Sequence, residues 1–138
     1  MTRVVFDTVG FVRGLINPIR RWGYIFFDYA NDYQLIVSEP IILEVLDVLQ
    51  RPAFMCLFKT LLGRDAAAIV AILTDAEFVE VREILAVSRD PKDDTFLATA
   101  TQAGADYLVS ENQDLLVRRE YEGVHIVNAA RFLDLLEQ

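Results

Sequence analysis

The chain has 138 residues, of which 54% are hydrophobic and 25% are charged. A chain of this length buries about two-thirds of its unfolded surface, so we expect one cooperative core and exclude disordered and collagen-like chains. Thirteen basic and 21 acidic residues give a net charge of −8 at pH 7, and because nucleic-acid-binding domains usually carry a basic face, the overall charge argues against binding to nucleic acid.

The first half of the chain predicts two strands, each followed by a helical segment. Residues 4–6 are an apolar run that an acid ends, which indicates a buried strand stopping at Asp7. A helical stretch that a proline interrupts follows over residues 10–29. Residues 34–37 predict the second strand, and Ser38 is a suitable N-cap for the next helix.

The second half continues this alternation. Residues 51–77 predict one or two helices, and residues 78–81 predict a short edge strand. The turn at residues 89–94 leads into a helix for which Gly104 is a natural C-terminal stop. The remaining predicted elements are strands at residues 107–109 and 124–127 and a closing helix capped by Asn128.

Strands that alternate with helices predict a mainly parallel sheet with helices on both faces. The expected fold class is therefore α/β, a three-layer α/β/α arrangement with four or five strands. The chain shows no linker, internal repeat or low-complexity segment, so we expect residues 1–138 to form a single domain.

Three features predict a cytoplasmic protein with no membrane segment. The single cysteine, Cys56, has no intramolecular disulfide partner, which favours a reducing compartment. Residues 1–7 place an acid where a signal peptide would be apolar. The longest apolar run, residues 66–73, is too short to span a bilayer.

Acidic side chains follow several of the predicted strands. Asp7 comes directly after the first strand, Glu44 lies on the helix after the second, and Asn112 and Asp114 follow the strand at residues 107–109. In parallel sheets, ligands bind beyond the carboxyl ends of the strands. We therefore expect these side chains to meet at one edge of the sheet.

Each acid also has a structural explanation. Glu44 lies on a charged helical stripe that is suited to solvent, and Asp114 can cap the turn that follows it. Asp93 and Asp94 can both cap the helix that starts beside them, and the pattern alone does not decide which of them turns inward. His125, the single histidine, alternates with apolar strand residues, so a serine or cysteine triad has little support.

Several carboxylates at one edge would repel one another unless a cation compensated their charge. An all-oxygen ligand set without cysteine or histidine favours Mg²⁺ or Mn²⁺. Such an ion can polarise a phosphate and activate water, so the pattern predicts hydrolysis of a phosphodiester.

Four sequence blocks resemble the PIN domain family, the nuclease fold of toxins in prokaryotic toxin–antitoxin pairs. They occur in the order in which the family has them and span nearly the whole chain. The blocks are residues 4–8, residues 38–52, residues 90–100, and residues 104–110 together with residues 114–116.

The resemblance implies a catalytic set of four acids. Asp7 matches the first metal-binding aspartate of the family, Glu44 the helical glutamate, and Asp94 the third acid, while Asp114 is the expected fourth charge. Asp7, Asp94 and Asp114 would bind Mg²⁺ or Mn²⁺. Asn112 falls in a slot that the family fills with Asp or Asn, and we expect it to support the site.

One departure from the family pattern bears on activity. Position 9, commonly asparagine in the family, is Val9, whose side chain cannot form hydrogen bonds with the acids. Thr8 remains available to hold Asp7 or a substrate phosphate. The sequence thus leaves two alternatives, an active nuclease and a catalytically weak or inactive PIN-fold binding module.

Two other aspartate-based chemistries fit poorly. An aspartyl-phosphate phosphatase would need an acid where Val9 stands. A receiver domain would need a lysine after a late strand, whereas the two lysines are Lys59 and Lys92.

The resemblance also implies the partners. They are a single-stranded RNA substrate, a second copy of the chain in a homodimer, and an antitoxin protein. Arginines suit phosphate contacts, and the candidates for guiding RNA near the site are Arg13, Arg20 and Arg21, which also suit a solvated helix face.

Overall fold

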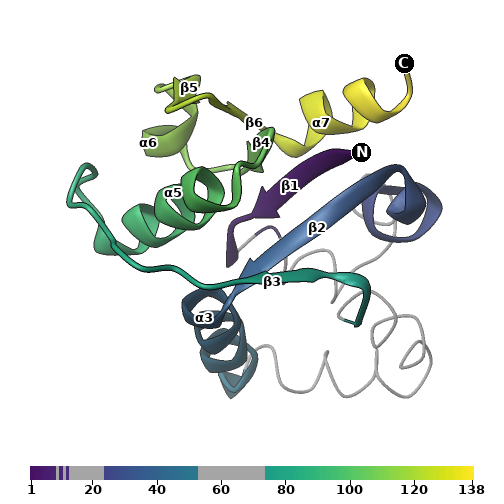
Figure 1. Cartoon of the computed structure of the whole chain (residues 1–138). Helices are drawn as coiled ribbons and strands as arrows, with labels where there is room; N and C mark the ends of the chain where they lie inside the picture. The colour runs from purple at the N-terminus through teal and green to yellow at the C-terminus, as the bar shows by residue number, and fades with distance from the viewer. Residues whose placement is uncertain (9, 11, 13–23, 53–73) are drawn as a thin grey trace.

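The structure is a computed structural model that describes residues 1–8, 10, 12, 24–52 and 74–138 (Figure 1). Most of the helical region expected at residues 51–77 lies outside the described residues. So do Cys56, Val9 and the three arginines proposed to guide RNA. The predictions made for those positions remain predictions.

The described elements alternate strands and helices as the sequence predicts. All five predicted strands are present, and a sixth, the two-residue β5, pairs with β6 in a hairpin too short to leave a pattern in the sequence. None of the described helices is long and apolar enough to cross a membrane. The strands are β1 (Thr2–Phe6), β2 (Tyr33–Ser38), β3 (Glu77–Val79), β4 (Tyr107–Val109), β5 (Glu120–Tyr121) and β6 (Val124–Val127). The helices are η1 (Tyr24–Asp28), η2 (Ala30–Asp32), α3 (Glu39–Leu49), α5 (Pro91–Ala103), α6 (Gln113–Leu116) and α7 (Ala129–Leu136).

Local contacts and backbone conformation explain where α5 and α7 begin and where α5 ends. The Asp90 carboxylate accepts a hydrogen bond from the Lys92 backbone amide at 3.0 Å and caps α5. Asn128 caps α7 in the same way through the Arg131 amide at 2.8 Å. Gly104 ends α5 with a φ of 65°, in the left-handed region that glycine enters without strain. The predicted roles of Gly104 and Asn128 are confirmed, whereas α5 is capped by Asp90.

The six strands form one sheet in the order β3-β2-β1-β4-β6-β5. Every pair is parallel except β5 with β6. The chain steps outward from β1 through β2 to β3 and then returns to β4, on the other side of β1. The strand order thus reverses between β1 and β4, which is where ligands bind in open α/β sheets.

Helices cover the two faces of this sheet. On one face the Phe6 ring packs against Phe26 of η1, with centroids 5.0 Å apart, and against Phe132 of α7, at 5.8 Å. Because side chains alternate along a strand, Val5 points to the opposite face, where α5 lies across β1, β2 and β4 (Figure 1). The predicted three-layer α/β/α fold is confirmed.

Candidate functional site

A cleft of about 380 Å³ opens beyond the carboxyl ends of β1 and β4, at the reversal of the strand order. Its residues come from the segment after β1, from α3, from the start of α5 and from the segment after β4. The cleft is lined by Asp7, Thr8, Glu44, Val48, Arg51, Asp90, Lys92, Asp93, Phe96, Glu111 and Asn112.

Asp7 lies directly after β1, where that strand pairs with β4. Its backbone amide donates to the carbonyl of Val109 at 3.1 Å, which continues the pairing of the two strands by one residue. Its carboxylate accepts a hydrogen bond from the Gly10 amide at 2.8 Å and one from the Ser110 hydroxyl at 2.6 Å. Asp7 is only 4% exposed, so its carboxylate is fixed from both sides.

Ser110 and Asn112 connect Asp7 to a second buried acid. The Ser110 hydroxyl, which donates to Asp7, accepts a hydrogen bond from the Asn112 backbone amide at 2.9 Å. The Asn112 side-chain amide donates to both carboxylate oxygens of Asp93 at 3.1 Å. One continuous hydrogen-bonded path therefore runs from Asp7 to Asp93.

Asp93 occupies an unfavourable place for a negative charge. Its side chain is 3% exposed, and this burial is the main reason that the pKa of its carboxyl is raised. The charges of Asp90, Asp114 and Asp7 raise the pKa further, and the hydrogen bond from Asn112 lowers it. A cation in the cleft would relieve this repulsion.

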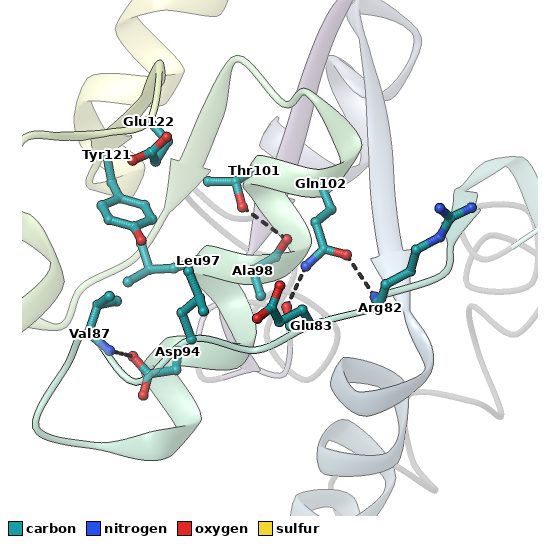
Figure 2. Close-up of a pocket in the computed structure, with 11 residues that line it drawn as sticks. Arg82, Glu83, Val87, Asp94, Leu97, Ala98, Thr101, Gln102, Tyr121 and Glu122 are labelled. Atoms are coloured by element: carbon teal, nitrogen blue, oxygen red, sulfur yellow. Dashed lines mark hydrogen bonds between the residues drawn. The ribbon is translucent and has the colours of Figure 1, made fainter.

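Asp94, which the family resemblance assigns to the metal, lies on a different side of α5. Its carboxylate accepts hydrogen bonds from the Val87 and Ser88 backbone amides, at 3.1 and 2.8 Å. Figure 2 shows it lining a second pocket together with residues such as Arg82 and Tyr121. The structure therefore brings Asp93, and not Asp94, together with Asp7 and Glu44.

Asp114 lies outside the cleft as well. Its carboxylate forms an ion pair with the guanidinium of Arg89 at 2.6 Å, and its side chain is 47% exposed. The charge of Asp114 nevertheless contributes to the raised pKa of Asp93, so the two carboxylates are electrostatically coupled. Inside the cleft, Asn112 stands where the family resemblance led us to expect the fourth acid.

Glu44 and Thr8 complete the predicted set. Glu44 faces the cleft from α3, with a side chain that is 19% exposed and lies 3.9 Å from the ammonium of Lys92. The hydroxyl of Thr8 is buried and has no hydrogen-bond partner within the part of the chain that the structure describes. Buried hydroxyls nearly always have a partner, so this one is a candidate contact for a ligand in the cleft.

A family model of the PIN domain matches residues 3–114. The chain belongs to the PIN domain family. PIN domains are generally nucleases and typically use divalent metal ions. The resemblance noted from the four sequence blocks is thereby confirmed.

Two solved structures share the fold of this PIN domain. PAE2754 from Pyrobaculum aerophilum matches with a TM-score of 0.58 and 15% identity, over 99% of this chain and 90% of that one. VapBC2 from Rickettsia felis, bound to a DNA fragment from its promoter, matches with a TM-score of 0.58 and 13% identity, over 92% of this chain and 98% of that one. No curated protein matches the sequence.

The cleft of this PIN domain fits a hard divalent cation in its donor chemistry. In the described ranges, no three histidine, cysteine or acidic side chains are grouped closely enough to hold a metal ion by themselves. Mg²⁺, however, usually binds through one or two carboxylates and keeps several waters. The buried pair of Asp7 and Asp93, in the same cleft as the Thr8 hydroxyl that has no partner among the described residues, meets that requirement.

Sequence reasoning did not assign several residues of this site, among them Asp93, Ser110 and Glu111. Ser110 bridges Asp7 and Asn112, and its position directly after the apolar β4 is the same signal that identified Asp7 after β1. Glu111 lines the cleft and accepts a hydrogen bond from the Ala129 amide at 3.0 Å, at the start of α7. The sequence carries no signal for that second contact, because it joins residues that are 18 positions apart.

Proposed function

We propose that this PIN domain is a Mg²⁺- or Mn²⁺-dependent endoribonuclease that hydrolyses phosphodiester bonds in single-stranded RNA, and that it acts as the toxin of a toxin–antitoxin pair. The observation that carries the proposal is the meeting of two buried carboxylates, Asp7 and Asp93, with Glu44 in one solvent-open cleft. Burying two carboxylates near each other costs stability, and a site that binds a cation accounts for that cost.

Each cleft residue has a role in this proposal. Asp7 and Asp93 would hold the cation, in positions set by Ser110 and Asn112. The bound ion would supply polarisation of the phosphate and a water of lowered pKa. Glu44, which faces the same space from α3, would orient the attacking water, and the Thr8 hydroxyl would donate to a phosphate oxygen.

Structural similarity supports the proposed antitoxin partner, and exposed side chains of α3 support the proposed homodimer. The structural neighbour VapBC2 is a complex bound to a promoter DNA fragment, which supports an antitoxin partner for this chain. Leu43 and Leu46 of α3 are 57% and 50% exposed, and exposed apolar side chains favour the expected homodimer. Light scattering would measure the oligomeric state, and a small adjacent gene for a DNA-binding protein would support the antitoxin.

The test of the metal site compares two neighbouring aspartates. We expect Mn²⁺ to raise the melting temperature of the wild-type protein and of Asp94→Asn, and to leave that of Asp93→Asn unchanged. The same pattern is expected for cleavage of a mixed RNA pool with and without EDTA. Asp94→Asn is the matched control, because it alters the same functional group one residue away on the other side of α5.

Stability in EDTA separates loss of function from loss of fold. The charged form of Asp93 is disfavoured by its surroundings, so Asp93→Asn should be at least as stable as the wild type at pH 7. Asp94→Asn weakens two hydrogen bonds to backbone amides, at a cost of about 1–2 kcal/mol. A Mn²⁺ response that disappears only in Asp94→Asn would reject the assignment of Asp93.

An inactive PIN-fold binding module is the second candidate. It is favoured by the lack, within the described residues, of any preformed group of three acidic, histidine or cysteine ligands. If neither Mg²⁺ nor Mn²⁺ changes the melting temperature and no RNA is cleaved, the enzyme proposal fails and this candidate stands.

A further inference from the structure

Two basic side chains lie in the acidic cleft. Arg51 follows the C-terminus of α3, and Lys92 is the second residue of α5. Among the described residues that line the cleft there are five carboxylates, and these two cations reduce their formal charge to −3. Within this described lining, a phosphate meets repulsion from the acids and attraction from these two residues, as it would from a bound metal ion.

Among the described residues, both cations are only loosely engaged by acids. Arg51 is 3.8 Å from the Asp47 carboxylate, and Lys92 is 3.9 Å from that of Glu44. By comparison, the ion pair of Arg89 with Asp114 closes to 2.6 Å. Side chains that are 55% and 61% exposed, at these distances, have donors left for another anion.

We propose that Arg51 and Lys92 are positioning residues that bind the phosphates on either side of the scissile phosphate. The inference rests on the proposed nuclease function and adds a requirement to it. The substrate must extend beyond a single phosphodiester, because a dinucleotide offers no flanking phosphate for these residues. The acids would act on the scissile phosphate itself, so binding and chemistry are assigned to different side chains.

Kinetics separate these roles. With a single-stranded RNA of about ten nucleotides, Arg51→Gln and Lys92→Gln should each raise KM about three- to tenfold and leave kcat within about twofold. With a dinucleotide, the wild type and both variants should cleave equally slowly. Arg51→Lys and Lys92→Arg keep the charge and should recover most of the affinity for the longer RNA.

The control is Arg82→Gln, an arginine that lines the second pocket on the other side of α5 (Figure 2). It removes the same charge from the protein but not from the cleft, so KM should stay within about twofold of wild type. An equal rise of KM in Arg82→Gln would show that only net charge matters and would overturn the proposal. An unchanged KM in both Arg51→Gln and Lys92→Gln would do the same.

A binding measurement keeps this test independent of turnover. In the Asp93→Asn background, fluorescence anisotropy of a labelled RNA of about ten nucleotides is followed against KCl concentration. Each removed phosphate contact should lower the salt dependence, the slope of log K on log[KCl], by about 0.7 for a single strand. If the wild type cleaves nothing while these slopes still fall, the nuclease function fails and the phosphate contacts stand. If the slopes do not change, the phosphate contacts are refuted whether or not RNA is cleaved.

Discussion

Replacing Ser110 by alanine tests the hydrogen bonds that hold the cleft together. The Ser110 hydroxyl is fully buried, donates to Asp7 at 2.6 Å and accepts from the Asn112 amide at 2.9 Å. A bond to a carboxylate contributes about 1.5–3 kcal/mol and a neutral one about 0.5–1.5 kcal/mol. We therefore expect Ser110→Ala to lower the free energy of unfolding by about 2–4 kcal/mol. In a chain of this length that corresponds to a fall in melting temperature of about 7–14 °C.

Ser38→Ala is the matched control. Ser38 is also fully buried at the end of a strand, but among the described residues its hydroxyl bonds the neutral hydroxyl of Thr99, at 2.9 Å, and no carboxylate. Its loss should cost about 1 kcal/mol. Urea denaturation in EDTA measures both costs, and titration with Mn²⁺ measures metal affinity, which should fall about 10- to 100-fold in Ser110→Ala only. If the two serine variants lose equal stability and bind Mn²⁺ equally well, Ser110 does not hold Asp7 in place.

Two further predictions concern Tyr33 and Gly104, which are not among the residues that line the cleft. Burial raises the pKa of the Tyr33 phenol, so the folded protein keeps a proton that the unfolded chain loses above about pH 10, and stability should fall as the pH rises beyond that point. Tyr33→Phe should make this fall shallower, at a cost of about 1 kcal/mol at pH 7 for the bond to the Ile25 carbonyl. Equal alkaline slopes in the two proteins would contradict this reasoning. Gly104→Ala should cost about 1 kcal/mol from backbone strain alone, because an added Cβ meets no atom within 4 Å. A urea-derived cost above about 3 kcal/mol would show that strain is not the main effect.

Much of the fold can be predicted from the sequence because strands and helix ends leave local signals. The apolar run before Asp7 predicts β1, and Gly104 predicts the end of α5; both are present in the structure. The hairpin strand β5 left no signal, because two residues are too few to show the alternation by which strands are detected.

Local sequence signals do not decide which of Asp93 and Asp94 faces the cleft. Successive residues on a helix point about 100° apart, so these two side chains cannot both face the cleft in the same way. The direction depends on which side of α5 packs against the sheet. The family spacing led to Asp94, whereas the packed helix points Asp94 at the Val87 and Ser88 amides and Asp93 at Asn112.

The sequence by itself determined that acidic residues stand after β1 and at the start of α5, because strand and helix boundaries leave local signals in the chain. It also determined the net charge of −8, which at first argued against nucleic acid. Only the tertiary structure decided which acids share a cleft and that Arg51 and Lys92 lie among them. Net charge is a sum over the whole chain, but a phosphate responds to the charges within about one Debye length, roughly 8–10 Å. Which charges lie that close depends on how distant segments pack.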